Sequence, residues 1–250
     1  MIALLWTVLL LFSLVKTKIV HYSSLAYFPI TYLASYSAYN ILSGKFRFRL
    51  WQKVLCLVIG GILSLVIVLL PVFDLNKDLL IAKGYITDPF IIGNLQAETG
   101  WTFLHSCIGI FLIAGLIISL IWFQRKKVAG IAGLYAFTLL FTLLSMMFLT
   151  KGAERISQNA AIVFIKEKAG EDVYIKTFYK SYAVLFYGQQ TEPDNRNAFD
   201  TKWLASGPVD KDAYFISRIN NKEEILEKYP ELRSLYEKNG YAFFVRKKKI

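Results

Sequence analysis

The chain has 250 residues, of which 55% are hydrophobic and 16% aromatic, and its formal net charge is +11. Soluble globular chains are usually about 45–50% apolar, so this composition argues against a wholly soluble protein and for one embedded in a bilayer. The positive charge does not indicate a nucleic-acid partner, because the basic residues lie in short loops and in the C-terminal part, without a basic helix or a base-stacking motif.

The charge pattern changes near Lys151. Only four acidic residues occur before it, namely Asp74, Asp78, Asp88 and Glu98. After it, acidic and basic residues are as frequent as in an ordinary soluble domain. The sequence therefore predicts a transmembrane helical domain at residues 1–150 and a water-soluble domain at residues 151–250.

A bilayer core of about 30 Å is crossed by roughly 20 apolar helical residues. Five hydrophobic segments are expected to be transmembrane helices, at residues 2–15, 25–42, 54–73, 104–123 and 128–150. The last three have full length and no formal charge, whereas the second is slightly short. The first is shorter than a full span. No basic residue precedes it and no small-x-small cleavage site follows, so we interpret it as a membrane helix that begins abruptly and not as a signal peptide.

Basic loops predict the orientation. The loop after the second segment carries four basic residues and the loop after the fourth carries three: Lys45, Arg47, Arg49, Lys53, Arg125, Lys126 and Lys127. The positive-inside rule places both loops in the cytoplasm. With five crossings, the loop 74–103 and the domain 151–250 are then extracytoplasmic. Lys16 and Lys18 fall on the outer side against this rule, which suggests that they have a specific role there.

A candidate binding segment precedes the second hydrophobic segment. Lys16, Lys18, His21 and Tyr22 gather at a predicted membrane surface, shortly before Pro29. Cations at this depth suit a lipid phosphate, because Coulomb attraction strengthens where water is scarce, and tyrosine adds a hydroxyl donor. The alternative is an aromatic belt with lysines that extend to the headgroups, and the residues alone favour neither.

Two further groups have a structural interpretation that we favour over a functional one. Tyr32, Tyr36 and Tyr39 share one helix face and are expected to form hydrogen bonds with neighbouring helices. The acids of the loop 74–103 could act as a general base or bind a metal, but they have no fixed spacing, so a solvated loop is the better interpretation. The two cysteines, Cys56 and Cys107, lie in hydrophobic segments and are expected to pack there.

The C-terminal domain shows alternating helix and strand patterns. Helices are expected at residues 157–168, 181–187 and 222–228, and strands at 172–178, 213–219 and 241–246. Asn221 is a typical N-cap for the last helix and Pro230 a typical stop. The fold class predicted for the whole chain is a polytopic α-helical membrane protein with about five transmembrane helices and a small C-terminal α/β domain.

Three segments carry a resemblance to a known family. They are Lys18, Tyr22 and Pro29 with their spacing, the loop Asp88–Trp101, and the segment Glu171–Tyr187. Together they resemble bacterial GT-C glycosyltransferases of the aminoarabinose-lipid A transferase and protein O-mannosyltransferase group. The resemblance implies a multi-pass protein of the bacterial inner membrane with a periplasmic C-terminal domain. It also implies transfer of a sugar from a polyprenyl-phosphate donor to a lipid, glycan or protein acceptor of the cell envelope, with Lys18 and Tyr22 at the carrier phosphate and Lys16 assisting.

One departure from the family affects the predicted activity. The family's acidic catalytic residues lie in the first outer loop of a longer N-terminal half, and nothing in this sequence matches that loop. We therefore expect the chain to be the C-terminal portion of a longer enzyme, with the catalytic residues unknown. No cofactor is evident, and a divalent metal stays open. The alternative is a non-catalytic membrane subunit or receptor whose outer domain binds glycan or lipid.

Overall fold

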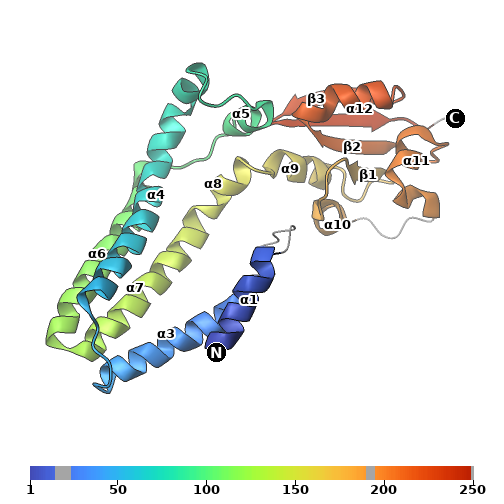
Figure 1. The fold of residues 1–250 in the computed structure, drawn as a ribbon. Helices are drawn as coiled ribbons and strands as arrows, with labels where there is room; N and C mark the ends of the chain where they lie inside the picture. The colour runs from blue at the N-terminus through green and yellow to red at the C-terminus, as the bar shows by residue number, and fades with distance from the viewer. Residues whose placement is uncertain (15–23, 190–194, 249–250) are drawn as a thin grey trace. The chain divides into compact units, whose positions relative to one another are not determined.

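The structure of the chain is a computed structural model that describes residues 1–14, 24–189 and 195–248. These residues form two compact units, each continuous in space but not in sequence. The first unit contains Met1–Val68 and Cys107–Leu143, and the second contains Leu69–Ser106 and Leu144–Ile250. Figure 1 shows the elements of both units in chain order.

The first unit consists of helices. They are α1 (Ile2–Leu14), the 3-10 helix η1 (Ser24–Ala26), α3 (Tyr27–Leu42), the first part of α4 (Leu50–Ala82), most of α6 (Phe103–Arg125) and most of α7 (Lys127–Phe148). Within the described residues, α4, α6 and α7 are long and apolar enough to cross a membrane, and α1 is a shorter apolar helix. The chain is thus a helical membrane protein, as predicted, while the count of five spans stays a prediction. Helix α4 extends past both ends of the predicted segment 54–73.

Small residues bring α4, α6 and α7 close together. A Cβ added to Gly60 of α4 would lie 2.1 Å from Leu116 Cδ1 of α6, and one added to Gly115 of α6 would lie 2.3 Å from the Phe137 ring of α7. Ser64 of α4 donates a hydrogen bond of 2.6 Å to the carbonyl of Gly109 in α6. Helices in lipid associate through such close backbone approach and interhelical hydrogen bonds, because lipid provides little hydrophobic drive between them.

The second unit contains a four-stranded sheet and its helices. The helices are α5 (Pro89–Leu95), α8 (Thr150–Arg155), α9 (Asn159–Glu167), α10 (Ala183–Tyr187), η2 (Arg196–Phe199), α11 (Thr201–Ser206), η3 (Ile219–Asn221) and α12 (Lys222–Lys228). The strands are β1 (Tyr174–Thr177), β2 (Ala213–Arg218), β3 (Arg233–Lys238) and β4 (Tyr241–Arg246), in the order β1-β2-β4-β3. Strands β1 and β2 are parallel, and the other neighbouring pairs are antiparallel.

Each face of the sheet is covered by helices, which gives three layers. One core includes Phe215 and Phe244 together with residues of α11 and α12. The other includes Ile216 and Phe243 together with residues of α9 and α10. Successive side chains of a strand point to opposite faces, so β2 and β4 supply both cores. This arrangement confirms the predicted α/β domain, and Figure 1 shows α12 and α9 on the two sides of the sheet.

Candidate functional site

The predicted lipid-phosphate residues, Lys16, Lys18, His21 and Tyr22, lie outside the described residues. The description resumes with η1, which leads directly into α3. Pro29 is buried in the first turn of α3, where a missing N–H removes no helical hydrogen bond. The structure therefore describes the helix that follows the predicted segment, α3, and the residues that surround it.

An apolar cavity of about 450 Å³ lies beside α3 in the first unit. Its walls come from α3, α4, α6 and α7 and from Phe48 in the α3–α4 loop. Its volume is within the range of roughly 300–1,000 Å³ that is typical of small-molecule sites. The sequence interpretation missed this cavity, although the small residues Ala34 and Ala38 in α3, one helical turn apart, are a signal that could have indicated it.

Helix α3 presents two different faces. Four residues that line the cavity follow the helical spacing i, i+3, i+4 and i+7: Ala34, Ser37, Ala38 and Ile41. At about 100° per residue, Tyr32, Tyr36 and Tyr39 lie on the opposite face. Their side chains are at least half exposed, and Tyr32 and Tyr36 stack on each other with ring centroids 6.5 Å apart. The cavity is thus on the other side of α3, and the expectation that these tyrosines form hydrogen bonds with neighbouring helices stays a prediction.

Two of the hydroxyl groups along the cavity are bonded within their own helix, α7. Thr138 Oγ1 donates to the carbonyls of Leu134 (2.7 Å) and Tyr135 (3.0 Å), and Thr142 Oγ1 donates to the Thr138 carbonyl (2.9 Å). None of the described residues that line the cavity carries a formal charge. The cavity therefore offers mainly hydrocarbon surface without an acid or a base, although the hydroxyls of Ser37 and Tyr135 also belong to its lining. Its chemistry suits the hydrocarbon chain of a lipid.

Lys53 lies near Phe48, one of the residues that line the cavity. Its Nζ lies 5.8 Å from the ring centroid of Phe48 and 5.3 Å from that of Phe123, and the two rings make an edge contact with centroids 5.2 Å apart. A cation over aromatic rings is attracted by their negative faces. This contact fixes the α3–α4 loop on the start of α4 and on the end of α6, so Phe48 is held in its position in the cavity wall.

Two acids of the loop 74–103 have structural roles in the second unit. Asp74 accepts hydrogen bonds from Lys77 Nζ (3.0 Å) and from Thr99 Oγ1 (2.8 Å). Asp88 caps α5 by accepting from the backbone N–H of Phe90 (2.7 Å) and Ile91 (3.2 Å). Both contacts are structural, but Asp74 lies in α4 and its side chain is only 18% exposed, so the expectation of a solvated loop does not describe its surroundings.

Asp88 also connects α5 to the sheet domain. It accepts a hydrogen bond of 3.2 Å from the side-chain amide of Asn220. This bond and the backbone N–H bonds hold the pKa of the Asp88 carboxyl below its usual value, so it is a carboxylate at neutral pH. A carboxyl with a lowered pKa that caps a helix is a poor general base, so we assign Asp88 to structure.

The other polar candidates in this part of the chain are not gathered into a site. Asp78 and Glu98 are exposed. His105 Nδ1 accepts a hydrogen bond of 3.0 Å from the Thr102 backbone N–H at the start of α6. Among the described residues, no three His, Cys, Asp or Glu side chains are close enough together to hold a metal ion.

No family model and no curated protein sequence matches the chain. Two solved structures are similar to it, both of ArnT from Cupriavidus metallidurans, one in the apo state and one bound to undecaprenyl phosphate. Their TM-scores are 0.56 and 0.55 at 12% sequence identity, and each match covers 96% of this chain. The chain spans 44% of the length of those chains. The resemblance that the sequence motifs indicated is thus confirmed as a likeness of fold: this chain folds as the matching portion of the solved ArnT chains does.

Proposed function

We propose that this chain is the lipid-binding portion of a membrane glycosyltransferase that uses a polyprenyl-phosphate-linked sugar donor. The observation that carries the proposal is the apolar cavity of about 450 Å³ beside α3, in a chain whose fold is similar over 96% of its length to that of a protein solved with undecaprenyl phosphate. Burial of isoprenoid methyl and methylene groups in this cavity provides the binding free energy, at about 25 cal/mol per Å² of apolar surface.

The donor phosphate is assigned to the segment that precedes α3. Lys16 and Lys18 provide positive charge, and His21 and Tyr22 provide hydrogen-bond donors, all within a few residues of η1 in the sequence. Because α3 contributes one wall of the cavity, the headgroup residues and a tail-binding helix belong to one continuous stretch of chain. A lipid bound in this way has its phosphate at the membrane surface and its hydrocarbon among the helices.

The sugar is transferred to an acceptor on the outer face of the membrane by groups that we do not assign to the described residues. Asp74 and Asp88 have structural roles. The acid that assists transfer in this proposal comes from the part of the enzyme that corresponds to the remaining length of the ArnT chains. A receptor or subunit that binds the lipid without transferring the sugar is the alternative, and it is favoured by the absence of any charged group among the described residues of the cavity wall.

The proposed topology has five spans, with the boundary between membrane and soluble domains near Lys151. The basic loops 43–49 and 125–127 face the cytoplasm, and residues 151–250 lie in the periplasm of the inner membrane. Alkaline phosphatase fused after Lys248 is expected to be active, and the same enzyme fused within the loop at Lys126 to be inactive. Reversed activities would overturn the orientation.

Donor binding tests the site. The full chain in nanodiscs is titrated with undecaprenyl phosphate, and Ala38→Phe, which fills the cavity, is expected to weaken binding at least tenfold. Ser35→Phe is the matched control, because it adds the same ring to α3 away from the face that lines the cavity. Lys18→Ala and Tyr22→Phe are expected to weaken binding of the phosphate but not of the corresponding polyprenol. Equal binding by the Ala38 and Ser35 variants would remove the cavity from the site.

Transfer is tested separately from binding. The chain is supplied with a polyprenyl-phosphate sugar and a membrane-envelope extract, with and without a polypeptide that corresponds to the remaining length of the ArnT chains. Release of polyprenyl phosphate supports the transferase. Tight binding with no release in either mixture supports the receptor.

A further inference from the structure

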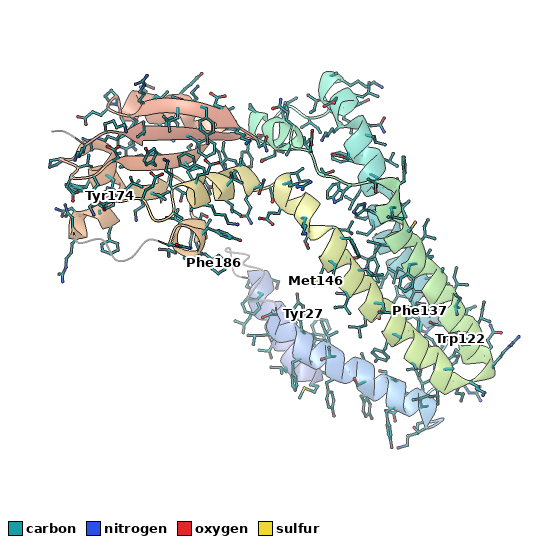
Figure 2. The ribbon with its side chains drawn as sticks, turned by 180° about the vertical axis from the view of Figure 1, so that it is seen from behind. Tyr27, Trp122, Phe137, Met146, Tyr174 and Phe186 are labelled. Atoms are coloured by element: carbon teal, nitrogen blue, oxygen red, sulfur yellow. The ribbon has the colours of Figure 1, made fainter. Side chains whose placement is uncertain are left out.

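Helix α10 and its N-cap residue Tyr182 expose three large side chains on the surface of the second unit. Tyr182, Leu185 and Phe186 are 70%, 70% and 78% exposed, while Val184 on the other side of α10 is buried in the core beneath the sheet. Figure 2 labels Phe186 at this helix. The sheet domain thus uses one side of α10 for its own core and leaves a patch of three adjacent apolar side chains uncovered.

Such a patch has a free-energy cost in water and usually marks a surface with a partner. Single exposed apolar residues are common. Three neighbouring ones are less so, because exposing apolar surface to water costs about 25 cal/mol per Å² and the cost adds up over the patch. Lysines lie beside the patch. Lys180 is exposed, and Lys166 Nζ lies 4.7 Å from the ring centroid of Tyr187. Aromatic and aliphatic side chains bordered by lysines are typical of segments that lie in the headgroup layer of a bilayer.

The connection to the membrane helices identifies the partner. Helix α7, which is long and apolar enough to cross a membrane, ends at Phe148, and α8 begins at Thr150. Helix α8 contacts α9, and α9 contacts α10. Helices α9 and α10 share one core under one face of the sheet, whereas α12 lies on the opposite face. The α10 patch therefore belongs to the face of the domain that is joined directly to a membrane helix.

We infer that Tyr182, Leu185 and Phe186 insert into the headgroup layer of the bilayer that contains α7. The Tyr182 ring and the Leu185 and Phe186 side chains lose contact with water there, and Lys166 and Lys180 lie among the lipid phosphates. This anchor goes beyond the proposed function, because it requires no donor and no transfer. It fixes the sheet domain at the membrane surface at a second point besides the chain connection through α8.

Depth measurements by electron paramagnetic resonance test the anchor. The full chain carries Cys56→Ala and Cys107→Ala, and a nitroxide is attached at Phe186→Cys or Leu185→Cys. The control is Glu227→Cys, an exposed position of α12 on the opposite face of the sheet. The proteins are measured in nanodiscs of phosphatidylethanolamine and phosphatidylglycerol, with oxygen as the lipid-soluble relaxant and a nickel chelate as the water-soluble one.

The expected result is a several-fold higher ratio of oxygen to nickel collisions at Phe186 and Leu185 than at Glu227. Equal ratios at the three positions would mean that the patch lies in water, and the inference would be overturned. Protection of Phe186 from both relaxants would overturn it as well, because a protein surface and not lipid would then cover the patch. Thermal unfolding of the labelled chains identifies any variant that has lost its fold.

Discussion

Gly93 of α5 and Gly240 of the β3–β4 turn meet backbone to backbone. A Cβ added to Gly93 would lie 2.3 Å from the Gly240 nitrogen, and one added to Gly240 would lie 2.5 Å from the Phe90 carbonyl oxygen. Gly240 also has a φ of +78°, in the region that glycine adopts at little cost. Arg218 lies over the Phe90 ring at 4.9 Å, and Asn220 bonds to Asp88. Helix α5 is thus part of the same folded body as the sheet.

Gly93→Ala is expected to destabilise the second unit by about 1–3 kcal/mol, because the new methyl group has backbone on its far side and no flexible side chain that could move. Without a close contact, alanine would instead stabilise the helix by up to about 1 kcal/mol relative to glycine. A loss of stability in Gly93→Ala therefore indicates the contact. Gly61→Ala is the matched control, since its Cβ would lie 4.0 Å from Ile113 Cδ1. Thermal unfolding in nanodiscs measures both. Equal midpoints for the two variants would contradict the close contact.

Glu231→Gln is expected to lower the free energy of unfolding by about 1–3 kcal/mol, because it leaves the buried guanidinium of Arg246 without its carboxylate partner. Arg246 is 2% exposed, forms an ion pair with Glu231 and donates to the Leu204 carbonyl at 3.0 Å. Asp172→Asn is the comparison, in an ion pair with Lys211 whose Asp172 side chain is 80% exposed. For Asp172→Asn we expect the free energy of unfolding to fall by only about 0–1 kcal/mol, because this ion pair is exposed to water. A larger loss in Asp172→Asn than in Glu231→Gln, measured by denaturant unfolding, would refute the argument.

Asp88 makes the attachment of α5 dependent on pH. The bond from Asn220 and the bond from the Ile91 N–H lower the pKa of Asp88 from its ordinary value of 3.8. A carboxyl whose pKa is lower in the folded state stabilises that state above its unfolded pKa, and the contribution disappears as the pH falls through the folded pKa. We therefore expect protease cleavage near α5 to increase below about pH 4. Asp88→Asn should show the faster cleavage already at neutral pH, with little further change in acid, and a pH response equal to that of the unmodified chain would be inconsistent with this role.

Tyr241→Phe is expected to lower the free energy of unfolding by about 1–2 kcal/mol, because it removes the hydrogen bond to Ser157 and the side-chain hydrogen bond with Tyr179. The Tyr241 hydroxyl donates to the Ser157 carbonyl at 2.8 Å and thereby links β4 to the segment between α8 and α9. Tyr182→Phe removes a hydroxyl from a side chain that is 70% exposed and should leave stability unchanged. Chemical unfolding followed by circular dichroism compares the two, and equal midpoints would argue against the link.

The strands that sequence patterns predicted are those with apolar or alternating side chains. Strand β4 is buried along its length because it lies between β2 and β3, and its sequence is correspondingly apolar. Strand β3 (Arg233–Lys238) was missed because it is an exposed edge strand with charged residues, a composition that discourages pairing with other sheets. Asn239-Gly240 could have revealed it, since both residues have positive φ and this pair is typical of a tight hairpin turn.

The candidate site was less accessible to sequence reasoning than the fold. Hydropathy identifies α4, α6 and α7 as apolar helices. It cannot distinguish a helix face that packs against another helix from a face that lines a cavity, because both are apolar. The cavity exists because Ala34 and Ala38 are too small to fill the room beside α3, and this depends on where three other helices lie. The sequence correctly placed Tyr32, Tyr36 and Tyr39 on one face of α3. What that face contacts could not be deduced from the sequence of one helix.

The cavity beside α3 has a consequence for selectivity. Thr138 and Thr142 are already bonded to the backbone of α7, and no described residue of the lining is charged, so no ionic contact holds an occupant at a fixed depth. Affinity should then increase by about 0.8 kcal/mol for each methylene that enters, and stop increasing once the cavity is full. A lipid could slide along such a wall with little change in free energy. The position of the reactive phosphate would therefore be determined at the membrane surface, while the hydrocarbon supplies affinity without alignment.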